Sequence, residues 1–230
     1  MPTPRFPDAV LDHLPQAVTI SGKGVDLPGV LTLPGNPAGI VVFAHGSGSS
    51  RLSARNRFVA DALVQANFGT LLFDLLSDAE AQDRANVFDI PLLAERLRVA
   101  TAWLMASPAA AGLPIGYFGA STGAAAALVA TARAGAVVQA VVSRGGRPDL
   151  AGDFLPRVRV PTLLIVGEAD LKVLELNRTA LRRLGGVRQL AVVPRATHLF
   201  EEPGALDRVA GLAAFWFGRH LGAESVRKVS

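Results

Sequence analysis

One pentapeptide and its flanking segments constrain the fold more than any other part of the chain. Gly119-Ala120-Ser121-Thr122-Gly123 directly follows the apolar run 115–118, and small helix-forming residues continue over 124–133. A strand, a G-x-S-x-G turn and a helix in this order predict an elbow that holds the serine in a strained conformation above a sheet. The two glycines are expected because a side chain at either position would collide with the neighbouring strand or helix. The alternative is an ordinary turn between a strand and a helix that happens to contain a serine.

Short apolar runs alternate with helix-periodic segments along the whole chain. The runs expected to form buried strands are 39–43, 70–73, 115–118, 138–142, 162–166 and 187–193. Apolar residues at helical spacing occupy 58–66, 93–104 and 206–216, and Asp89 is the predicted N-cap of the second helix. Segments 17–21 and 25–32 predict an antiparallel N-terminal hairpin, although Pro28 weakens its second strand. This order predicts an α/β fold, a mostly parallel twisted sheet with helices on both faces.

Length and composition predict one domain over residues 1–230, with residues 1–14 as an N-terminal arm. Half of the 230 residues are hydrophobic, which suits a single core. Only about twenty residues separate the strands 138–142 and 162–166, so we expect no large lid and an open site. No secretory signal and no membrane-spanning run is recognisable, so a soluble, cytoplasmic protein without a membrane partner is expected.

Charge and motif content argue against several other classes of function. The net charge is +4, and the arginines are scattered among acidic residues rather than gathered with aromatic ones, so no nucleic-acid partner is expected. The glycine-rich loop 45–50 lacks both the G-x-G-x-x-G spacing and a P-loop lysine, which argues against a nucleotide site. The chain has no cysteine and no histidine–acid cluster with ligand spacing. We therefore expect no metal, no cofactor and no thiol nucleophile.

A serine nucleophile needs a general base, and the chain contains four histidines. His198 lies in the loop that follows strand 187–193, and loops at the carboxyl ends of parallel strands open onto the same edge as the elbow. His13 and His220 are expected at the surface, and His45 belongs to a different loop. We therefore predict His198 as the base.

The base in turn needs an acid that holds its tautomer and stabilises the imidazolium. Asp170 follows the strand 162–166 and is the predicted acid, with Glu168 as its competitor. Asp74, which follows the strand 70–73, is expected to be structural. The order Ser121, Asp170, His198 is the order of triad residues expected after an elbow of this type.

Two backbone amides are predicted to hold the oxyanion. One is the amide of Thr122 at the start of the elbow helix, and the other is the amide of Ser47 in the loop 45–50. His45 is expected to brace this loop.

Three arginines, Arg51, Arg144 and Arg147, follow strand ends on the same predicted edge. One of them is a candidate to bind a substrate carboxylate in a bidentate manner. The alternative is that all three are solvated surface residues.

Three segments together resemble the α/β-hydrolases, and more narrowly the short, lidless proteins called dienelactone hydrolase-like. They are 44–51, 118–123 and 196–204, and the likeness spans nearly the whole chain after about Val18. The resemblance implies an α/β-hydrolase fold and acyl-transfer chemistry. Dienelactone hydrolases proper have a cysteine nucleophile, which this chain lacks, so the resemblance does not extend to dienelactone as the substrate.

The residues and the resemblance together predict a serine hydrolase that cleaves small carboxylic esters through an acyl-enzyme. The alternatives are an amide or thioester hydrolase, an acyltransferase with the same triad, and a catalytically silent α/β-hydrolase that serves as a binding module. The sequence predicts neither the natural ester nor the oligomeric state.

Overall fold

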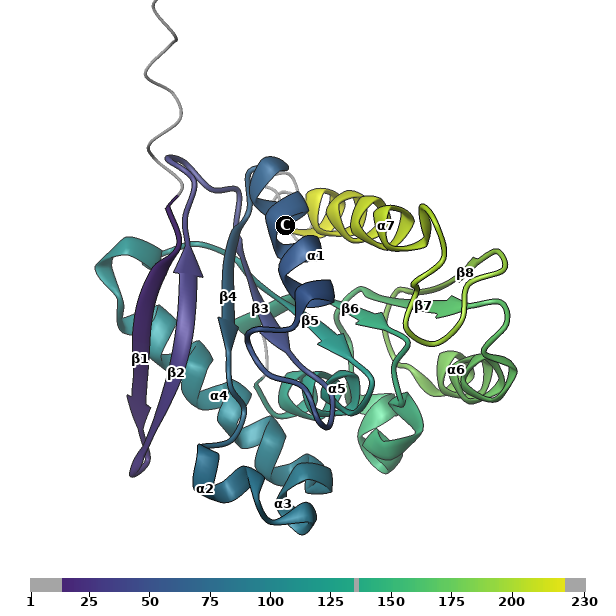
Figure 1. Ribbon diagram of the computed structural model, residues 1–230, viewed down its shortest axis with the longest axis horizontal. Helices are drawn as coiled ribbons and strands as arrows, with labels where there is room; N and C mark the ends of the chain where they lie inside the picture. The colour runs from purple at the N-terminus through teal and green to yellow at the C-terminus, as the bar shows by residue number, and fades with distance from the viewer. Residues whose placement is uncertain (1–13, 135–136, 222–230) are drawn as a thin grey trace, which may run out of the picture.

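A single eight-stranded sheet runs through the molecule in the order β1-β2-β4-β3-β5-β6-β7-β8 (Figure 1). The computed structural model describes residues 14–134 and 137–221, so the predicted arm up to residue 13, including His13, lies outside the described residues. The strands are β1 (Gln16–Gly22), β2 (Val25–Thr32), β3 (Ile40–Ala44), β4 (Gly69–Phe73), β5 (Ile115–Ala120), β6 (Val138–Arg144), β7 (Thr162–Gly167) and β8 (Arg188–Val193). Pairs from β4 to β8 are parallel, whereas β2 pairs antiparallel with both β1 and β4. The predicted sheet and N-terminal hairpin are confirmed.

Pro28 lies inside β2 without interrupting it. The carbonyl of Pro28 accepts the amide of Asp74 at 3.1 Å, so the proline nitrogen also faces the β4 side, just beyond the residues that pair there. The β1–β2 ladder therefore loses no donor, which is why the strand tolerates the proline.

Helices cover both faces of the sheet (Figure 1). On one face α1 (Ala54–Gln65) and α7 (Ala205–His220) pack against each other and the sheet. On the other face lie α4 (Ile90–Ala106), α5 (Thr122–Ala134) and α6 (Leu171–Arg183). Asp89 caps α4 as predicted, since its carboxylate accepts the amide of Leu92 at 2.9 Å. Phe58, however, was expected on the apolar face of α1 and is 42% exposed, because this helix turns Ala60 and Val64 inward instead.

A small cap follows β4. It consists of α2 (Asp78–Ala81) and α3 (Arg84–Phe88), which precede α4 in the chain. Ser77 and Glu80 form a reciprocal capping box at the start of α2, and Glu80 also pairs with Arg96 of α4. Short turns are η1 (Pro108–Ala110) and η3 (Pro148–Arg157); η3 fills the connection between β6 and β7, where no lid-sized insertion occurs.

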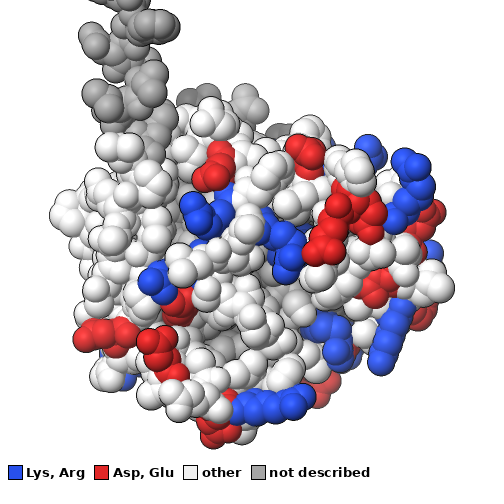
Figure 2. Space-filling view, viewed as in Figure 1, with Lys and Arg blue, Asp and Glu red and all other residues white. Residues whose placement is uncertain are grey.

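The surface carries both charge signs. On the face drawn in Figure 2, acidic and basic side chains lie next to one another without a continuous basic stripe. Within residues 14–134 and 137–221, every helix is either too short or too polar to cross a bilayer.

Candidate active site

Ser121 stands at the tip of a tight turn between β5 and α5. Its φ is +50°, a conformation that costs a non-glycine residue on the order of 1–3 kcal/mol and is retained where the surrounding structure enforces it. A Cβ on Gly119 would lie 2.5 Å from the Cα of Ala124, and a Cβ on Gly123 would overlap the Ala44 carbonyl. These collisions, one with the helix and one with the neighbouring strand, are the predicted reason for both glycines. The turn is therefore an elbow with a half-buried serine.

The loop after β3 passes directly beside this serine. A Cβ on Gly46 would lie 2.9 Å from the Cβ of Ser121 and 3.1 Å from the carbonyl oxygen of Ala120. Only a glycine permits this approach, so Gly46 sets the distance between the loop 45–50 and Ser121.

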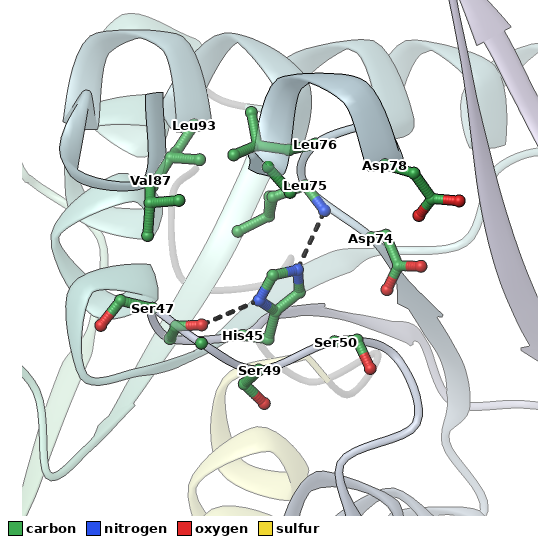
Figure 3. Close-up of a pocket in the computed structure, with 13 residues that line it drawn as sticks. His45, Ser47, Ser49, Ser50, Asp74, Leu75, Leu76, Asp78, Val87 and Leu93 are labelled. Atoms are coloured by element: carbon green, nitrogen blue, oxygen red, sulfur yellow. Dashed lines mark hydrogen bonds between the residues drawn. The ribbon is translucent and has the colours of Figure 1, made fainter. Parts of the chain in front are cut away.

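His45 braces that loop through both of its ring nitrogens (Figure 3). Its Nε2 accepts the amide of Leu75 at 3.0 Å, and its Nδ1 lies 3.0 Å from the carbonyl oxygen of Gly46. Because an amide can only donate, Nε2 carries no proton and Nδ1 donates to Gly46. Burial lowers the pKa of His45 below its ordinary value of 6.5, although the Gly46 carbonyl and Asp74 oppose the shift. His45 is thus a neutral link between the loops that follow β3 and β4.

This lowered pKa predicts a pH dependence of stability. Below pH 6.5 the unfolded chain binds a proton at His45 before the folded chain does, so stability falls until the pH reaches the lower pKa of the folded state. We expect Tm to fall less between pH 7 and pH 5.5 in His45→Gln than in the wild type. Each kcal/mol of stability linked to His45 corresponds to a difference of about 2–4 °C in Tm. Thermal unfolding is the measurement, because a hydrolysis assay would also report on His198, the predicted base. Equal pH slopes for the two proteins would contradict this account of His45.

His198 and Asp170 are joined by a short hydrogen bond. The Nδ1 of His198 lies 2.6 Å from Oδ2 of Asp170, and because the carboxylate accepts, Nδ1 is the donor and Nε2 is left to face a substrate or nucleophile. Asp170 occupies the N-cap of α6 but makes no side-chain capping bond, since its carboxylate is turned to His198. Glu168 accepts the amide of Arg195 at 2.8 Å instead. The structure therefore pairs His198 with Asp170 and not with the competitor.

The His198 loop also reaches the strand beside the elbow. A Cβ on Gly145 would lie 3.5 Å from Cε1 of His198, and Gly145 directly follows Arg144, the partner of Ala120 in the β5–β6 ladder. The loop is tied back on itself by Glu202, which accepts the amide of Thr197 at 2.9 Å. Glu202 lies in the segment 196–204 that carries the resemblance, but no role was predicted for it. Ser121, Asp170 and His198 thus all follow strands that end at the same carboxyl edge of the sheet, and a hydrogen bond joins the last two.

The two predicted oxyanion donors are neighbours. Thr122 is the first residue of α5, and the amide of Ser47 donates to its Oγ1 at 2.9 Å. The loop 45–50 and the elbow are therefore connected by a direct hydrogen bond as well as by the Gly46 contact.

The three arginines differ in their surroundings. Arg51 is bound to the carboxylate of Asp74 through both its amide and its guanidinium, and Arg147 forms a bidentate pair with Asp149 at 2.9 and 2.8 Å. The solvated-surface alternative is wrong for Arg144, which is only 6% exposed.

Arg144 has an amide oxygen for a partner rather than a carboxylate. Its Nη2 donates to Oδ1 of Asn56 at 2.9 Å. Burial, together with the nearby charge of Arg55, lowers the pKa of Arg144 to about 10. The guanidinium is therefore a buried charge that the sequence did not reveal.

A cavity of about 170 Å³ lies between the loop 45–50 and the cap (Figure 3). Its apolar wall is formed by Leu75, Leu76, Val87 and Leu93. Asp74 and Asp78 stand at one side of it. Among the described residues, no group of three histidines or acids is arranged to hold a metal ion.

Comparison with known proteins places the chain among its relatives. No protein-family model matches it. It is 61% identical over 206 residues to two Mycobacterium tuberculosis proteins that carry the name "Putative phosphoribosyl transferase". That match covers 90% of this chain but only 46% of either relative, so the chain spans less than half the length of these curated proteins.

Solved structures resemble the chain over nearly its full length. The dienelactone hydrolase of Anabaena variabilis is 54% identical, with a TM-score of 0.89 over 91% of this chain and 99% of that one. The esterase domain of a Rhodothermus marinus protein is 20% identical with a TM-score of 0.74, over 91% of this chain and 100% of that one, and shows the same fold. Given its identity to the Anabaena variabilis protein over almost all of both chains, this chain belongs to the dienelactone hydrolase family of the α/β-hydrolases.

Proposed function

We propose that this protein is a serine hydrolase that cleaves small carboxylic esters through an acyl-enzyme. The observation that carries the proposal is the 2.6 Å bond from His198 to Asp170 at the same sheet edge as the strained Ser121. A histidine oriented by a carboxylate is the base that a serine nucleophile needs for acyl transfer.

The proposed reaction has two halves. Ser121 Oγ attacks the ester carbonyl while Nε2 of His198 takes its proton, and Asp170 stabilises the imidazolium. The amides of Ser47 and Thr122 bind the oxyanion, which collapses to the acyl-enzyme as His198 returns the proton to the departing alcohol. Water then attacks the acyl-enzyme, again with His198 as base, and releases the carboxylic acid and the free serine.

The cavity supports a substrate with a small apolar part. Its apolar wall faces the loop 45–50, whose Gly46 lies against Ser121, although neither Ser121 nor His198 lines the cavity. This loop contact is the basis for proposing that the cavity holds an acyl or alcohol group. A volume of about 170 Å³ suits a group of a few carbon atoms. Arg51 and Arg147 are already paired with carboxylates of the protein, whereas Arg144 donates to an amide oxygen. Arg144 is therefore the proposed partner for a carboxylate on the substrate.

The proposal is tested with p-nitrophenyl esters of increasing acyl length. We expect kcat/KM to be highest for short acyl chains and to fall as the acyl group outgrows the cavity. Val87→Ala enlarges the cavity and is expected to shift the optimal acyl length by about 1–2 carbon atoms toward longer chains. Val187→Ala, at an exposed position before β8, is the control and should leave the optimum unchanged. An unchanged length profile in Val87→Ala would remove the cavity from the substrate site.

Other acyl-transfer reactions use the same groups. Product analysis in the presence of added alcohols or amines separates an acyltransferase from a hydrolase, and amide and thioester substrates complete the comparison. A protein that neither turns over these compounds nor reacts with a fluorophosphonate would be a silent binding module.

We propose that the transferase activity in the name of the Mycobacterium tuberculosis relatives refers to the part of those proteins that this chain does not match. The observation behind it is that the loop 45–50, the glycine-rich loop weighed as a phosphate cradle, is packed against Ser121 by Gly46. Pyrophosphate release by the purified chain from a phosphoribosyl donor would contradict this assignment.

A further inference from the structure

The hydrogen bond between Ser47 and Thr122 concerns the oxyanion hole itself. The amide of Ser47 donates to the hydroxyl oxygen of Thr122 at 2.9 Å, across 75 positions of sequence. Thr122 is only 4% exposed, so this hydroxyl is not freely solvated. One amide assigned to the oxyanion therefore has, in the free protein, an acceptor on the residue that supplies the other amide.

Such an acceptor fixes the direction of the Ser47 amide in the free protein. The loop 45–50 contains Gly46 and Gly48, the latter with φ of +68°, so its backbone has alternatives that would turn the Ser47 amide away. The Thr122 hydroxyl holds this amide beside the start of α5, where the second donor lies.

We propose that the Thr122 side chain is a positioning group of the oxyanion hole. The inference rests on the proposed function. In the free protein the Thr122 hydroxyl oxygen accepts the hydrogen bond of the Ser47 amide, and during the reaction the oxyanion replaces it as the acceptor. When a neutral substrate carbonyl replaces the Thr122 hydroxyl as acceptor of the Ser47 amide, the hydrogen bond becomes little stronger, because both acceptors are neutral. The oxyanion gains more, because hydrogen bonds to an ionised acceptor are about twice as strong. The hydroxyl thus holds the amide in position until the oxyanion forms, so its removal is expected to lower kcat rather than to raise KM.

The competing explanation is that Thr122 only fills space at the start of α5. Thr131 provides a matched control on the same helix, since it is also 4% exposed and its hydroxyl donates to the carbonyl of Ala127 at 2.7 Å. Removal of that hydroxyl tests the cost of changing a buried threonine in α5 without touching the elbow.

The experiment compares Thr122→Val, Thr122→Ser and Thr131→Val on the best p-nitrophenyl ester. Thr122→Val keeps the shape and removes the acceptor, and we expect its kcat to fall by about 10- to 100-fold with KM changed by less than about threefold. Thr122→Ser restores the hydroxyl and should recover most of the lost kcat. The rate of labelling by a fluorophosphonate, whose phosphoryl oxygen occupies the same hole, should fall and recover in parallel. Thr131→Val should match the wild type in both assays.

Several results would overturn the inference. They are a Thr122→Val enzyme with wild-type kcat, a Thr122→Ser enzyme as slow as Thr122→Val, and a loss that appears only in KM. Thermal unfolding accompanies each assay, and Thr122→Ala replaces Thr122→Val if the valine variant does not fold. A wild-type protein that neither hydrolyses esters nor reacts with the fluorophosphonate would refute the proposed function instead, so the two failures are distinguishable.

Discussion

Ser121→Ala is expected to lower kcat for p-nitrophenyl ester hydrolysis by about 10⁴- to 10⁶-fold while KM changes little. The variant removes the attacking oxygen but leaves the turn, because alanine can occupy the same φ of +50° at similar cost. The remaining rate would reflect binding and the oxyanion donors alone. Steady-state kinetics on purified protein, with labelling by a fluorophosphonate as a second readout, measures the effect.

A second serine provides the control for general effects of a serine-to-alanine substitution. Ser107, the C-cap of α4, precedes β5 and so lies toward the opposite edge of the sheet. Ser107→Ala should retain wild-type kcat and labelling. Near wild-type hydrolysis by Ser121→Ala would show that another group performs the chemistry.

Asp170→Asn is expected to lower kcat by about 10³- to 10⁴-fold. The carboxylate of Asp170 accepts from Nδ1 of His198 and so keeps Nε2 free to take the serine proton. An asparagine can present its amide nitrogen instead, which favours the opposite tautomer, and it cannot stabilise the imidazolium by charge. Steady-state kinetics of both proteins on the same p-nitrophenyl ester measures the effect.

Glu168→Gln is the control for this substitution. The substitution neutralises Glu168, the acid that competed with Asp170 in the sequence analysis. In the wild type the Glu168 carboxylate accepts the amide of Arg195 and does not bind His198. We expect its kcat to stay within about twofold of the wild type. If Glu168→Gln lost as much activity as Asp170→Asn, the identity of the acid would have to be revised.

The fold was predictable from the sequence because its signals are local. Alternating strands and helices, the glycines beside Ser121 and the cap at Asp89 each depend on a few adjacent residues, and all agree with the structure. The order of the three predicted triad residues was equally accessible, since each follows a strand that ends at the same edge.

What could not be predicted depends on contacts between distant segments. The bond from Ser47 to Thr122 and the burial of Arg144 under Asn56 each join residues at least 75 positions apart. The exposure of Phe58 depends on the rotation of α1 about its axis, which is set by the packing of α1 on α7. The choice between Asp170 and Glu168 likewise depends on a loop conformation that spacing alone leaves open.

In the proposed function, the cap that follows β4 is a separable specificity element. It joins the rest of the chain at only two points, the end of β4 and the start of α4, while Ser121, Asp170 and His198 come from loops after β5, β7 and β8. Exchanging 76–88 for a segment of another length or composition would reshape one wall of the cavity without altering any strand that carries the reacting groups. Substrate range could therefore diverge, in nature or by engineering, through one surface insertion while the chemistry stays the same.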